Sequence, residues 1–450
     1  MRVVVIGGDA AGMSAASEAK RRAPEAEVVV LEATGDVSYG ACGLPYKLAD
    51  GARVEDLQIL TAERFRGERG IDVRLGHLVE KIDAERRMVR GTSEQGPFEL
   101  GYDKLVIATG ARAIKPPIAG IDELWGKGVY PLKTLQDGRT WKKVLADKPS
   151  SVAIVGGGYI GLEATETLRE GGLQVTVLEA LPTLVPFLTA TGQERVLAEA
   201  HKHGVDVRLG ALVQRLQRRA NGKIGITTSA GELEVDVVLM AVGVRPNTDV
   251  ATGAGIELSV AGSIRVDEQL RTSVADIFAA GDVTDAFHAV TGARVWIPLA
   301  LRANRAGKLV GRLVTGGKAK APPVLGTAAF RFFGLEVART GLTLEEAKAE
   351  GFDAVQSEIK SGTRAKYYPG GGKLTVCLIG DRASGRLLGG TMVGPEGAAH
   401  RIDTLAAAIH AQRTAEQLYD MDLAYSPPFG PSWSPLLLAA SQLMKDMRAK

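Results

Sequence analysis

Six residues near the middle of the chain, GGGYIG at 156–161, have the types and spacing of a turn that holds a phosphate. Gly156, Gly158 and Gly161 would let the backbone turn tightly and bring amide groups close to a pyrophosphate at the start of a helix. Glu179 closes this unit, where a carboxylate can accept hydrogen bonds from an adenosine ribose but would repel a 2′-phosphate. These residues predict a dinucleotide site that favours NADH, with NADPH as the alternative. A purely structural turn is the competing interpretation.

A second glycine turn lies at the start of the chain and has a similar layout. Gly7 and Gly12 take the outer glycine positions, and Glu32 ends the unit as Glu179 does in the other copy. Asp9 replaces the middle glycine, so its carboxylate must turn away from a diphosphate or take a cation. Much later, Asp282 follows an apolar segment and a glycine, a placement suited to hydrogen-bonding the polyol chain of a flavin. Together these residues predict an FAD site; a structural turn with an ordinary turn acid is the alternative.

The chain has two cysteines, and only one of them is in a setting that suggests chemistry. Cys42 lies in the segment SYGACGLPY at 38–46, ten residues after Glu32, whereas Cys377 lies inside an apolar strand-like run. A thiolate near a positive or polar group is a nucleophile, and a flavin or helix-end amides could supply that setting for Cys42. Cys377 is expected to be a core residue. Two cysteines exclude a disulfide framework and a CxxC zinc site, so we expect no metal. A buried packing thiol is the alternative for Cys42.

The elements that must position these residues form two strand–helix–strand units. Apolar runs and helical spacing place them at 2–6, 13–22 and 27–32, and again at 151–155, 162–170 and 174–179. Segments 102–110 and 235–243 each return the chain to its sheet, the first through Thr109 and Gly110. A Gly/Lys/Pro-rich junction at 316–323 precedes a third region. Its apolar runs at 328–333, 374–379 and 387–393, with a helical pattern at 402–411, predict an antiparallel sheet with helices.

Composition excludes several other classes of protein. The 450 residues suit about three domains, and 45% apolar with 24% charged residues is ordinary for a globular chain. The net charge of +3 comes from dispersed charges, so we expect no nucleic-acid partner. No apolar run approaches the roughly 18 residues of a membrane span. The first residues are too soon interrupted by glycine for a signal peptide, and a cytoplasmic protein is expected.

The order of both glycine turns, the Ala108-Thr109-Gly110 turn and the Gly281-Asp282 pair resembles the pyridine nucleotide-disulfide oxidoreductase family over nearly the whole chain. The resemblance implies an α/β protein with two Rossmann-like domains, for FAD and NAD, an α+β dimerisation domain, and a homodimer. By analogy Tyr159 is a gate over the flavin and Glu163 a polar neighbour of the isoalloxazine. The implied divisions are 1–115 (FAD domain, first part), 116–149 (connection), 150–245 (NAD(P)H domain), 246–324 (FAD domain, second part) and 325–450 (dimerisation domain).

The cysteine count narrows the resemblance to one branch of the family. Two-cysteine members carry a second cysteine near the first, and this chain has only Cys42 in the CGLPY pattern. That pattern is similar to coenzyme A disulfide reductases and their relatives among NADH oxidases and polysulfide reductases. Single-cysteine peroxidases and water-forming oxidases place a histidine where this chain has Ala10. The tail at 424–429 also lacks the His-Pro pair of the two-cysteine reductases.

The same branch suggests which side chains handle the substrate. Tyr367 and Tyr425 match tyrosines that these reductases bring from the partner subunit to assist a departing sulfur, although both could simply pack at an interface. Two residues depart from the pattern: Ala41 replaces an asparagine, and Trp433 replaces a substrate-binding lysine. The residues at positions that hold coenzyme A in the family are Ser14, Glu18, Arg21, Ser38 and Arg69.

We therefore predict an FAD-dependent NAD(P)H oxidoreductase that reduces a disulfide, such as coenzyme A disulfide, or a polysulfide or persulfide, through Cys42. The partner would be coenzyme A or another small thiol. Two alternatives stay open on the sequence: an NADH oxidase that reduces oxygen at the flavin, and a flavin-binding redox sensor with incidental turnover.

Overall fold

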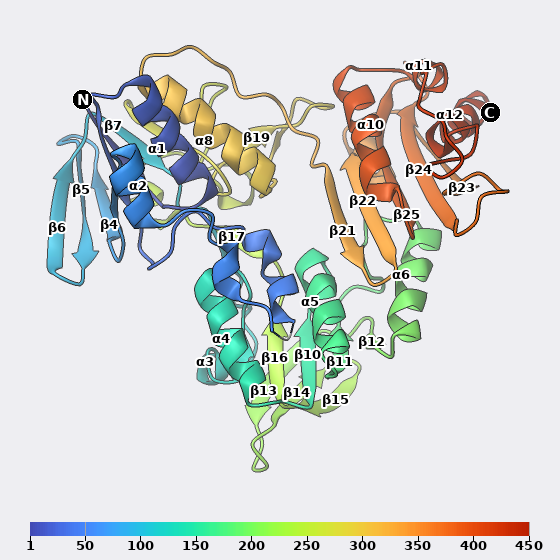
Figure 1. Ribbon diagram of the computed structural model, residues 1–450, viewed down its shortest axis with the longest axis horizontal. Coiled ribbons are helices and arrows are strands. Elements are labelled where there is room, and N and C mark those ends of the chain that lie inside the picture. The colour runs from blue at the N-terminus through green and yellow to red at the C-terminus, as the bar shows by residue number, and fades with distance from the viewer. Residues whose placement is uncertain (50, 450) are drawn as a thin grey trace.

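The computed structural model describes residues 1–49 and 51–449, which fold into three lobes, each built on its own main sheet (Figure 1). Two of these sheets are parallel, and the third is antiparallel. The α/β class with an α+β C-terminal part, predicted from the sequence, is confirmed. No helix of the described residues is both long and apolar enough to cross a membrane.

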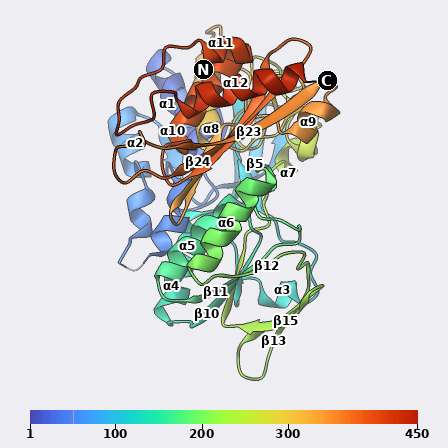
Figure 2. The ribbon, with the colours of Figure 1, turned by 90° about the vertical axis from the view of Figure 1, so that its right-hand side faces the viewer.

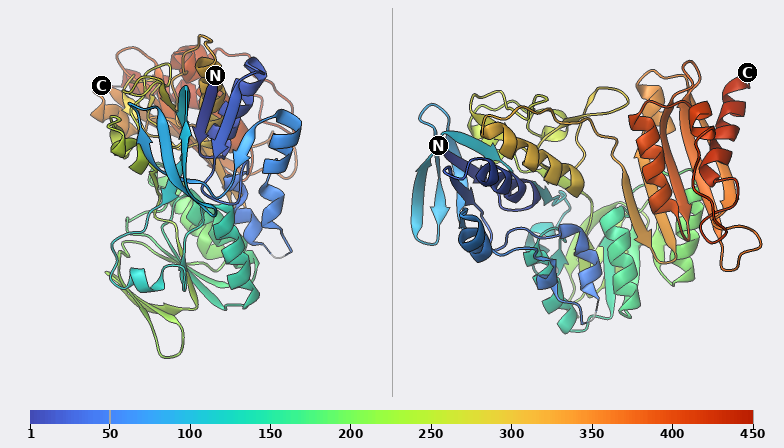
Figure 3. Two further views of the ribbon diagram at one scale, coloured as in Figure 1. Left: turned by 90° about the vertical axis from the view of Figure 1, so that its left-hand side faces the viewer. Right: turned by 45° about the horizontal axis from the view of Figure 1, so that its top comes forward.

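The first lobe has a five-stranded parallel sheet with β1 at its centre. Val3, Val4 and Val5 of β1 are fully buried, as expected of a strand that is covered on both faces. Helices α1 and α8 lie side by side on this sheet (Figure 3), and a small antiparallel sheet, β4-β5-β6, extends from it. The strands of the parallel sheet, in spatial order, are β18 (Ile277–Ala279), β7 (Lys104–Ile107), β1 (Arg2–Ile6), β2 (Glu27–Leu31) and β3 (Asp72–Arg74). The strands of the small sheet are β4 (Leu78–Asp83), β5 (Met88–Ser93) and β6 (Gly96–Gly101). Its helices are α1 (Ala10–Arg22), α2 (Ala62–Arg69) and α8 (Ala300–Val314), and the segment with Cys42 has the short turns η1 (Ala41–Gly43), η2 (Pro45–Leu48) and η3 (Val54–Leu57).

The second lobe repeats the parallel design with β10 at the centre. β10 is buried at all five positions and pairs with β11 and β16, as β1 pairs with β2 and β7. Its main sheet is β12 (Asp206–Arg208), β11 (Gln174–Leu178), β10 (Ser151–Val155), β16 (Val237–Met240) and β9 (Val129–Tyr130), and its outer sheet is β13 (Val213–Arg218), β14 (Ile224–Thr228) and β15 (Gly231–Val235). Its helices are α3 (Ile121–Leu124), α4 (Leu135–Ala146), α5 (Tyr159–Glu170) and α6 (Ala190–Lys202).

A short antiparallel ladder joins the first two lobes. The chain passes from the first lobe to the second through β8 (Ala111–Ala113) and returns through β17 (Val244–Pro246), and these two strands pair with each other. After β17 come α7 (Asp249–Gly253) and η4 (Val260–Gly262). A second short ladder, of β19 (Ala286–Phe287) and β20 (Arg294–Val295), lies between β18 and α8 along the chain.

The third lobe is a five-stranded antiparallel sheet with α10 and α12 packed against it (Figures 2 and 3). The sequence predicted three of its strands and missed β22 and β23, whose sequences LEVARTG and AVQSEIKSG contain charged and polar residues that leave no continuous apolar run. Its strands, in spatial order, are β21 (Ala328–Phe332), β22 (Leu335–Gly341), β25 (Leu387–Gly394), β24 (Lys373–Asp381) and β23 (Ala354–Gly362). Its helices are α9 (Leu344–Ala349), α10 (Ala398–His410), α11 (Ala415–Tyr419) and α12 (Pro435–Arg448).

The helices that follow the glycine turns start earlier than the sequence suggested. α1 begins at Ala10 and α5 at Tyr159, three residues before the predicted starts at 13 and 162. The second halves of the turns are already helical, so their amides stand in the first turn of a helix. The strands before the acids end at Leu31 and Leu178, which leaves Glu32 and Glu179 just beyond the sheet.

Candidate functional site

Both glycine turns have the same backbone conformation at their first glycine. Gly7 has φ +102° and Gly156 has φ +106°, values that side-chain-bearing residues rarely adopt. A Cβ at Gly7 would lie 2.3 Å from the carbonyl oxygen of Ala108, and one at Gly156 would lie 2.5 Å from that of Ala241. Each turn therefore requires glycine because it runs against the end of a neighbouring strand.

The remaining glycines of the turns divide into two kinds. A Cβ at Gly12 or Gly161 would collide with the carbonyl of Gly7 or Gly156, so these two allow the helix to start close to the turn. Gly158 faces open space, with no atom within 4 Å of a Cβ built there, and it caps the N-terminus of α5. The α5 turn thus presents free backbone at a helix start, which suits a pyrophosphate.

Glu32 and Glu179 hold equivalent places in the two copies. The Glu32 carboxylate accepts hydrogen bonds from the amides of Gly8, at 2.7 Å, and Thr34, at 2.8 Å. The Glu179 carboxylate accepts equivalent bonds from the amides of Gly157, at 2.7 Å, and Leu181, at 2.8 Å. Each acid closes its own glycine turn, and its contact with a ribose stays a prediction.

Asp9 turns toward the segment that carries Cys42. One Asp9 carboxylate oxygen accepts a hydrogen bond of 3.2 Å from the amide of Tyr39, three residues before Cys42. Burial raises the pKa of Asp9 to about 6, although the Tyr39 amide and the charge of Lys133 act in the opposite direction. This side chain thereby links the first glycine turn to the cysteine segment.

A cavity of about 530 Å³ brings together four of the predicted site residues. Cys42 comes from η1, Tyr159 and Glu163 from the first turns of α5, and Asp282 from the loop after β18. Ala41, one of the two departures from the family pattern, also lines it. The lobes of the chain therefore meet at the cysteine, and the cavity has the size of a typical small-molecule site.

The Cys42 thiol is exposed, but its surroundings oppose ionisation. Desolvation by neighbouring atoms raises its pKa, and the carboxylates of Glu163, Asp282 and Asp9 raise it further. Lys133 lowers it, and this lysine lines the same cavity. The sequence analysis did not single out Lys133, and its charge reduces the rise in the pKa of Cys42 without reversing it. Cys377 differs, because burial in the third lobe raises its pKa to about 12.

Glu163 and Tyr159 form the α5 side of the cavity. Burial raises the pKa of Glu163 to about 7, while a 2.7 Å hydrogen bond from the Tyr46 hydroxyl lowers it. The ring of Tyr159 packs against Phe187 and Phe330, with ring centres 5.8 Å and 5.2 Å away. Sequence reasoning missed Tyr46, which belongs to the CGLPY pattern but gave no sign that it reaches α5.

Thr109 and Gly110 lie apart from this cavity as the described residues define it. The Thr109 hydroxyl donates to the carbonyl of Asn247 at 2.7 Å, and the Asn247 side-chain amide donates back to the Thr109 carbonyl at 2.8 Å. Gly110 has φ +64°, and its carbonyl accepts a hydrogen bond from the backbone amide of Asn247. Here these residues join the end of β7 to the region after β17, and their contact with a cofactor stays a prediction.

Four of the five residues proposed for coenzyme A share one surface beside α1. Ser14, Glu18 and Arg21 lie on α1, and Arg69, at the end of α2, donates to the Ser17 hydroxyl at 3.1 Å. Glu18 forms an ion pair with Arg21, and Ser14 donates to the side chain of Asn304 at 3.0 Å. The fifth, Ser38, lies at the first glycine turn, where its amide donates to the Gly8 carbonyl at 2.9 Å.

Among residues 1–49 and 51–449, no cluster of three or more His, Cys, Asp or Glu side chains could hold a metal ion.

The predicted tyrosines lie on the third lobe and contact each other. The hydroxyl groups of Tyr367 and Tyr425 are 2.7 Å apart, and the two side chains are 75% and 47% exposed. Neither is among the described residues that line the Cys42 cavity of the same chain. Trp433, the other departure, stacks on Tyr419 with ring centres 5.8 Å apart. A single chain therefore does not bring the tyrosines to its own cysteine.

Comparison with known proteins identifies the family of this chain. Residues 1–307 match the family described as pyridine nucleotide-disulphide oxidoreductase, and residues 327–435 match its dimerisation domain. The chain belongs to this family. As a pyridine nucleotide-disulphide oxidoreductase it is an enzyme, and membership implies a flavin and a nicotinamide nucleotide. The family resemblance seen in the sequence is confirmed.

Several relatives cover nearly the whole oxidoreductase. It is 38% identical to an NAD(P)H sulfur oxidoreductase (CoA-dependent) of Pyrococcus abyssi over 98% of both chains. It is 34% identical to an NADH oxidase of Methanocaldococcus jannaschii over 100% of both chains. Among solved structures it resembles a NAD-dependent persulfide reductase from A. fulgidus, with a TM-score of 0.94 and 34% identity over 99% of this chain and 83% of that one.

Proposed function

We propose that this oxidoreductase uses NADH to reduce a small disulfide, polysulfide or persulfide, such as that of coenzyme A, through FAD and the Cys42 thiolate. The observation that carries the proposal is the cavity in which an exposed lone cysteine meets Glu163 and Tyr159, at the junction of two glycine-turn lobes. The names of the relatives from Pyrococcus abyssi and A. fulgidus, both reductases of sulfur compounds, support it.

The residues present fit a flavin and a nicotinamide nucleotide. The turn at Gly7 and Gly12, with Glu32 and Asp282, would hold FAD, and Gly110 and Thr109 would lie nearby. When bound, the flavin carries electron pairs from the nicotinamide to sulfur. The second turn, with its open Gly158, would hold the nicotinamide nucleotide, and Tyr159 would cover the flavin.

NADH is favoured over NADPH by the residues around Glu179. Its carboxylate stands beyond β11 beside the glycine turn, where it would accept hydrogen bonds from a ribose and repel a 2′-phosphate. The next seven residues, ALPTLVP at 180–186, contain no Lys or Arg to bind that phosphate. Both features support NADH as the donor.

Reduction of one disulfide consumes the two electrons of one NADH. The Cys42 thiolate attacks one sulfur of the substrate, so that the substrate S–S bond breaks, one thiolate leaves and takes a proton, and a mixed disulfide forms. Two electrons from NADH then break the mixed disulfide, which returns Cys42 to the thiolate and releases the second thiol with a proton. Overall, one disulfide, one NADH and one proton yield two thiols and NAD⁺.

Tyr367 and Tyr425 would donate the protons from a second copy of the chain. The match of residues 327–435 to a dimerisation domain supports a homodimer. Hydrogen bonds from Ser432 and then Tyr367 lower the pKa of Tyr425, which makes its hydroxyl a better proton donor to a departing sulfur. The surface beside α1, with Arg21 and Arg69, would bind the phosphates of coenzyme A.

The NADH oxidase relative favours a second candidate, in which oxygen accepts the electrons. Anaerobic NADH oxidation with coenzyme A disulfide or polysulfide, compared with oxygen alone, tests the choice, together with identification of the released flavin. We expect fast turnover with a sulfur acceptor and FAD in the released fraction. Faster turnover with oxygen, with peroxide or water as product, would support the oxidase instead. Slow turnover with every acceptor would overturn both and favour a redox sensor.

A further inference from the structure

A lysine from the start of α4 enters the Cys42 cavity. Lys133 lines this cavity together with Cys42, and its ammonium lies 3.5 Å from a carboxylate oxygen of Asp282. It precedes Thr134, the residue that caps α4, so it comes from an element that is far from Cys42 in sequence. The lysine therefore brings a positive charge to the cysteine from another part of the fold.

The other charges that act on the Cys42 thiol are negative. Glu163, Asp282 and Asp9 all disfavour the thiolate, while Lys133 favours it. Arg302 also lines the cavity, but its guanidinium donates to backbone carbonyls of the loop at 281–285 and to the Thr284 hydroxyl. Arg305 lines the cavity as well, and Lys133 is the cation whose charge lowers the pKa of Cys42 against the three carboxylates.

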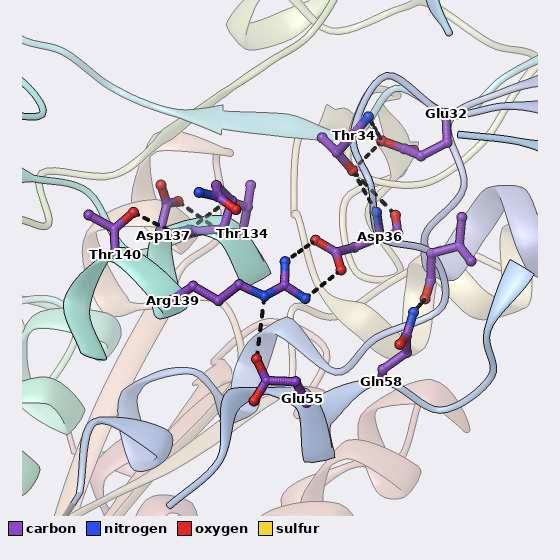
Figure 4. Close-up of polar contacts among 11 residues, drawn as sticks. Glu32, Thr34, Asp36, Glu55, Gln58, Thr134, Asp137, Arg139 and Thr140 are labelled. Carbon is purple, nitrogen blue, oxygen red and sulfur yellow. Dashed lines mark hydrogen bonds and ion pairs between the residues drawn. The ribbon is translucent and has the colours of Figure 1, made fainter. Parts of the chain in front are cut away.

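The backbone of Lys133 is fixed by a cap on α4. The Asp137 carboxylate accepts hydrogen bonds from the amides of Lys133, at 2.9 Å, and Thr134, at 2.8 Å. The Thr134 hydroxyl in turn accepts from the Asp137 amide at 3.1 Å, which completes a reciprocal cap (Figure 4). These bonds hold the start of α4 in one conformation.

The same helix is clamped to the segment that carries Cys42. Arg139 of α4 forms a two-pronged ion pair with Asp36, with both bonds at 2.7 Å, and a further contact with Glu55 at 3.4 Å (Figure 4). Asp36 and Glu55 lie on either side of Cys42 in the sequence. The clamp therefore holds the cysteine segment and the start of α4 in a fixed relation.

We propose that Lys133 is the positioning residue that favours the thiolate of Cys42, against the desolvation and the carboxylates that oppose it. This inference rests on the proposed function, because it gives Cys42 its role. When two electrons break the mixed disulfide, the Cys42 sulfur leaves as an anion that Lys133 stabilises, and the proton goes to the substrate sulfur. Without the lysine the pKa of Cys42 would rise further, because desolvation and the carboxylates already raise it.

The test measures how fast Cys42 reacts with iodoacetamide as the pH is varied, in the flavin-loaded protein, with the modified peptide quantified by mass spectrometry. Lys133→Gln should slow alkylation near neutral pH by about tenfold, the effect of one pKa unit on the thiolate fraction. Lys133→Arg should keep the wild-type profile. Lys47→Gln is the matched control, because Lys47 lies in the cysteine segment but is already paired with Asp56 at 3.1 Å.

An unchanged alkylation profile in Lys133→Gln, or an equal shift in Lys47→Gln, would overturn the inference. Lys133→Met keeps the aliphatic stem and gives the same test if glutamine disturbs folding. The outcome is separate from the proposed function, which fails if Cys42→Ser keeps its disulfide reductase activity whatever the alkylation profile of the lysine variants.

Discussion

Tyr46→Phe should change how reduction of the flavin by NADH depends on pH. The substitution removes only the hydroxyl that donates to Glu163 at 2.7 Å and leaves the ring in place. Hydride transfer adds negative charge to the flavin, so an ionised Glu163 beside it would oppose the step and a neutral one would not. Flavin reduction should therefore be fast below the pKa of Glu163, about 7, and slow as the pH rises through it.

The size of the change follows from the strength of the lost hydrogen bond. A hydrogen bond to a charged group is worth roughly 1.5–3 kcal/mol. Tyr46 is 43% exposed, so water competes with it and the lower end applies. Because about 1.4 kcal/mol corresponds to one pKa unit, the pKa of Glu163 should rise by about one unit in the variant. Fast flavin reduction should then extend to higher pH by about the same amount.

Stopped-flow absorbance of the flavin, recorded after mixing with NADH across the pH range, measures this midpoint. Tyr102→Phe is the control, because the buried Tyr102 hydroxyl finds no hydrogen-bond partner among the described residues. The control should keep the wild-type midpoint. A Tyr46→Phe midpoint equal to the wild-type one, or shifted to lower pH, would refute the assignment of Glu163 as the controlling group.

Three further predictions concern the nucleotide, the α4 clamp and the tyrosines. Wild type should have a higher kcat/KM with NADH than with NADPH, and Glu179→Gln should narrow that ratio by about tenfold; an NADPH preference in wild type contradicts this. Arg139→Leu leaves the buried Asp36 carboxylate unpaired and should lower the free energy of unfolding by about 3 kcal/mol in a denaturant titration; a loss below about 1 kcal/mol would match an ordinary surface pair. Tyr425→Phe should slow disulfide reduction by about a hundredfold without slowing flavin reduction; equal slowing of both steps in stopped-flow would contradict it.

The parts of this fold that depend on local sequence could be predicted. The two parallel sheets follow from short apolar strands next to glycine turns, and Gly7 and Gly156 have backbone angles, φ +102° and +106°, that favour glycine. The sequence predicted four residues of the site that the structure brings to one cavity: Cys42, Tyr159, Glu163 and Asp282. Family resemblance supplied two of these four, Tyr159 and Glu163, because spacing alone says nothing about which side chains converge.

The parts that depend on contacts between distant segments could not be predicted. Arg139 lies in α4 and Lys133 just before it, in a segment with an ordinary mixture of charges. Nothing in their spacing indicates that Arg139 reaches Asp36 or that Lys133 lines the Cys42 cavity. The raised pKa values of Asp9 and Glu163 arise from burial between lobes, which sequence patterns do not report. The strands β22 and β23 were missed because charged and polar residues interrupt their apolar residues, whereas the other strands of the lobe have longer apolar runs.

The central claim, that electrons reach the substrate through Cys42, is tested most directly by Cys42→Ser. Serine keeps the shape of the side chain but its hydroxyl is hardly ionised near neutral pH, so it cannot form the mixed disulfide on which thiol exchange depends. The measurement is anaerobic NADH oxidation with coenzyme A disulfide or polysulfide, next to the rate of flavin reduction by NADH. The account predicts that sulfur reduction is lost while flavin binding and flavin reduction remain. A variant that retains most of its disulfide or polysulfide reductase activity would contradict it.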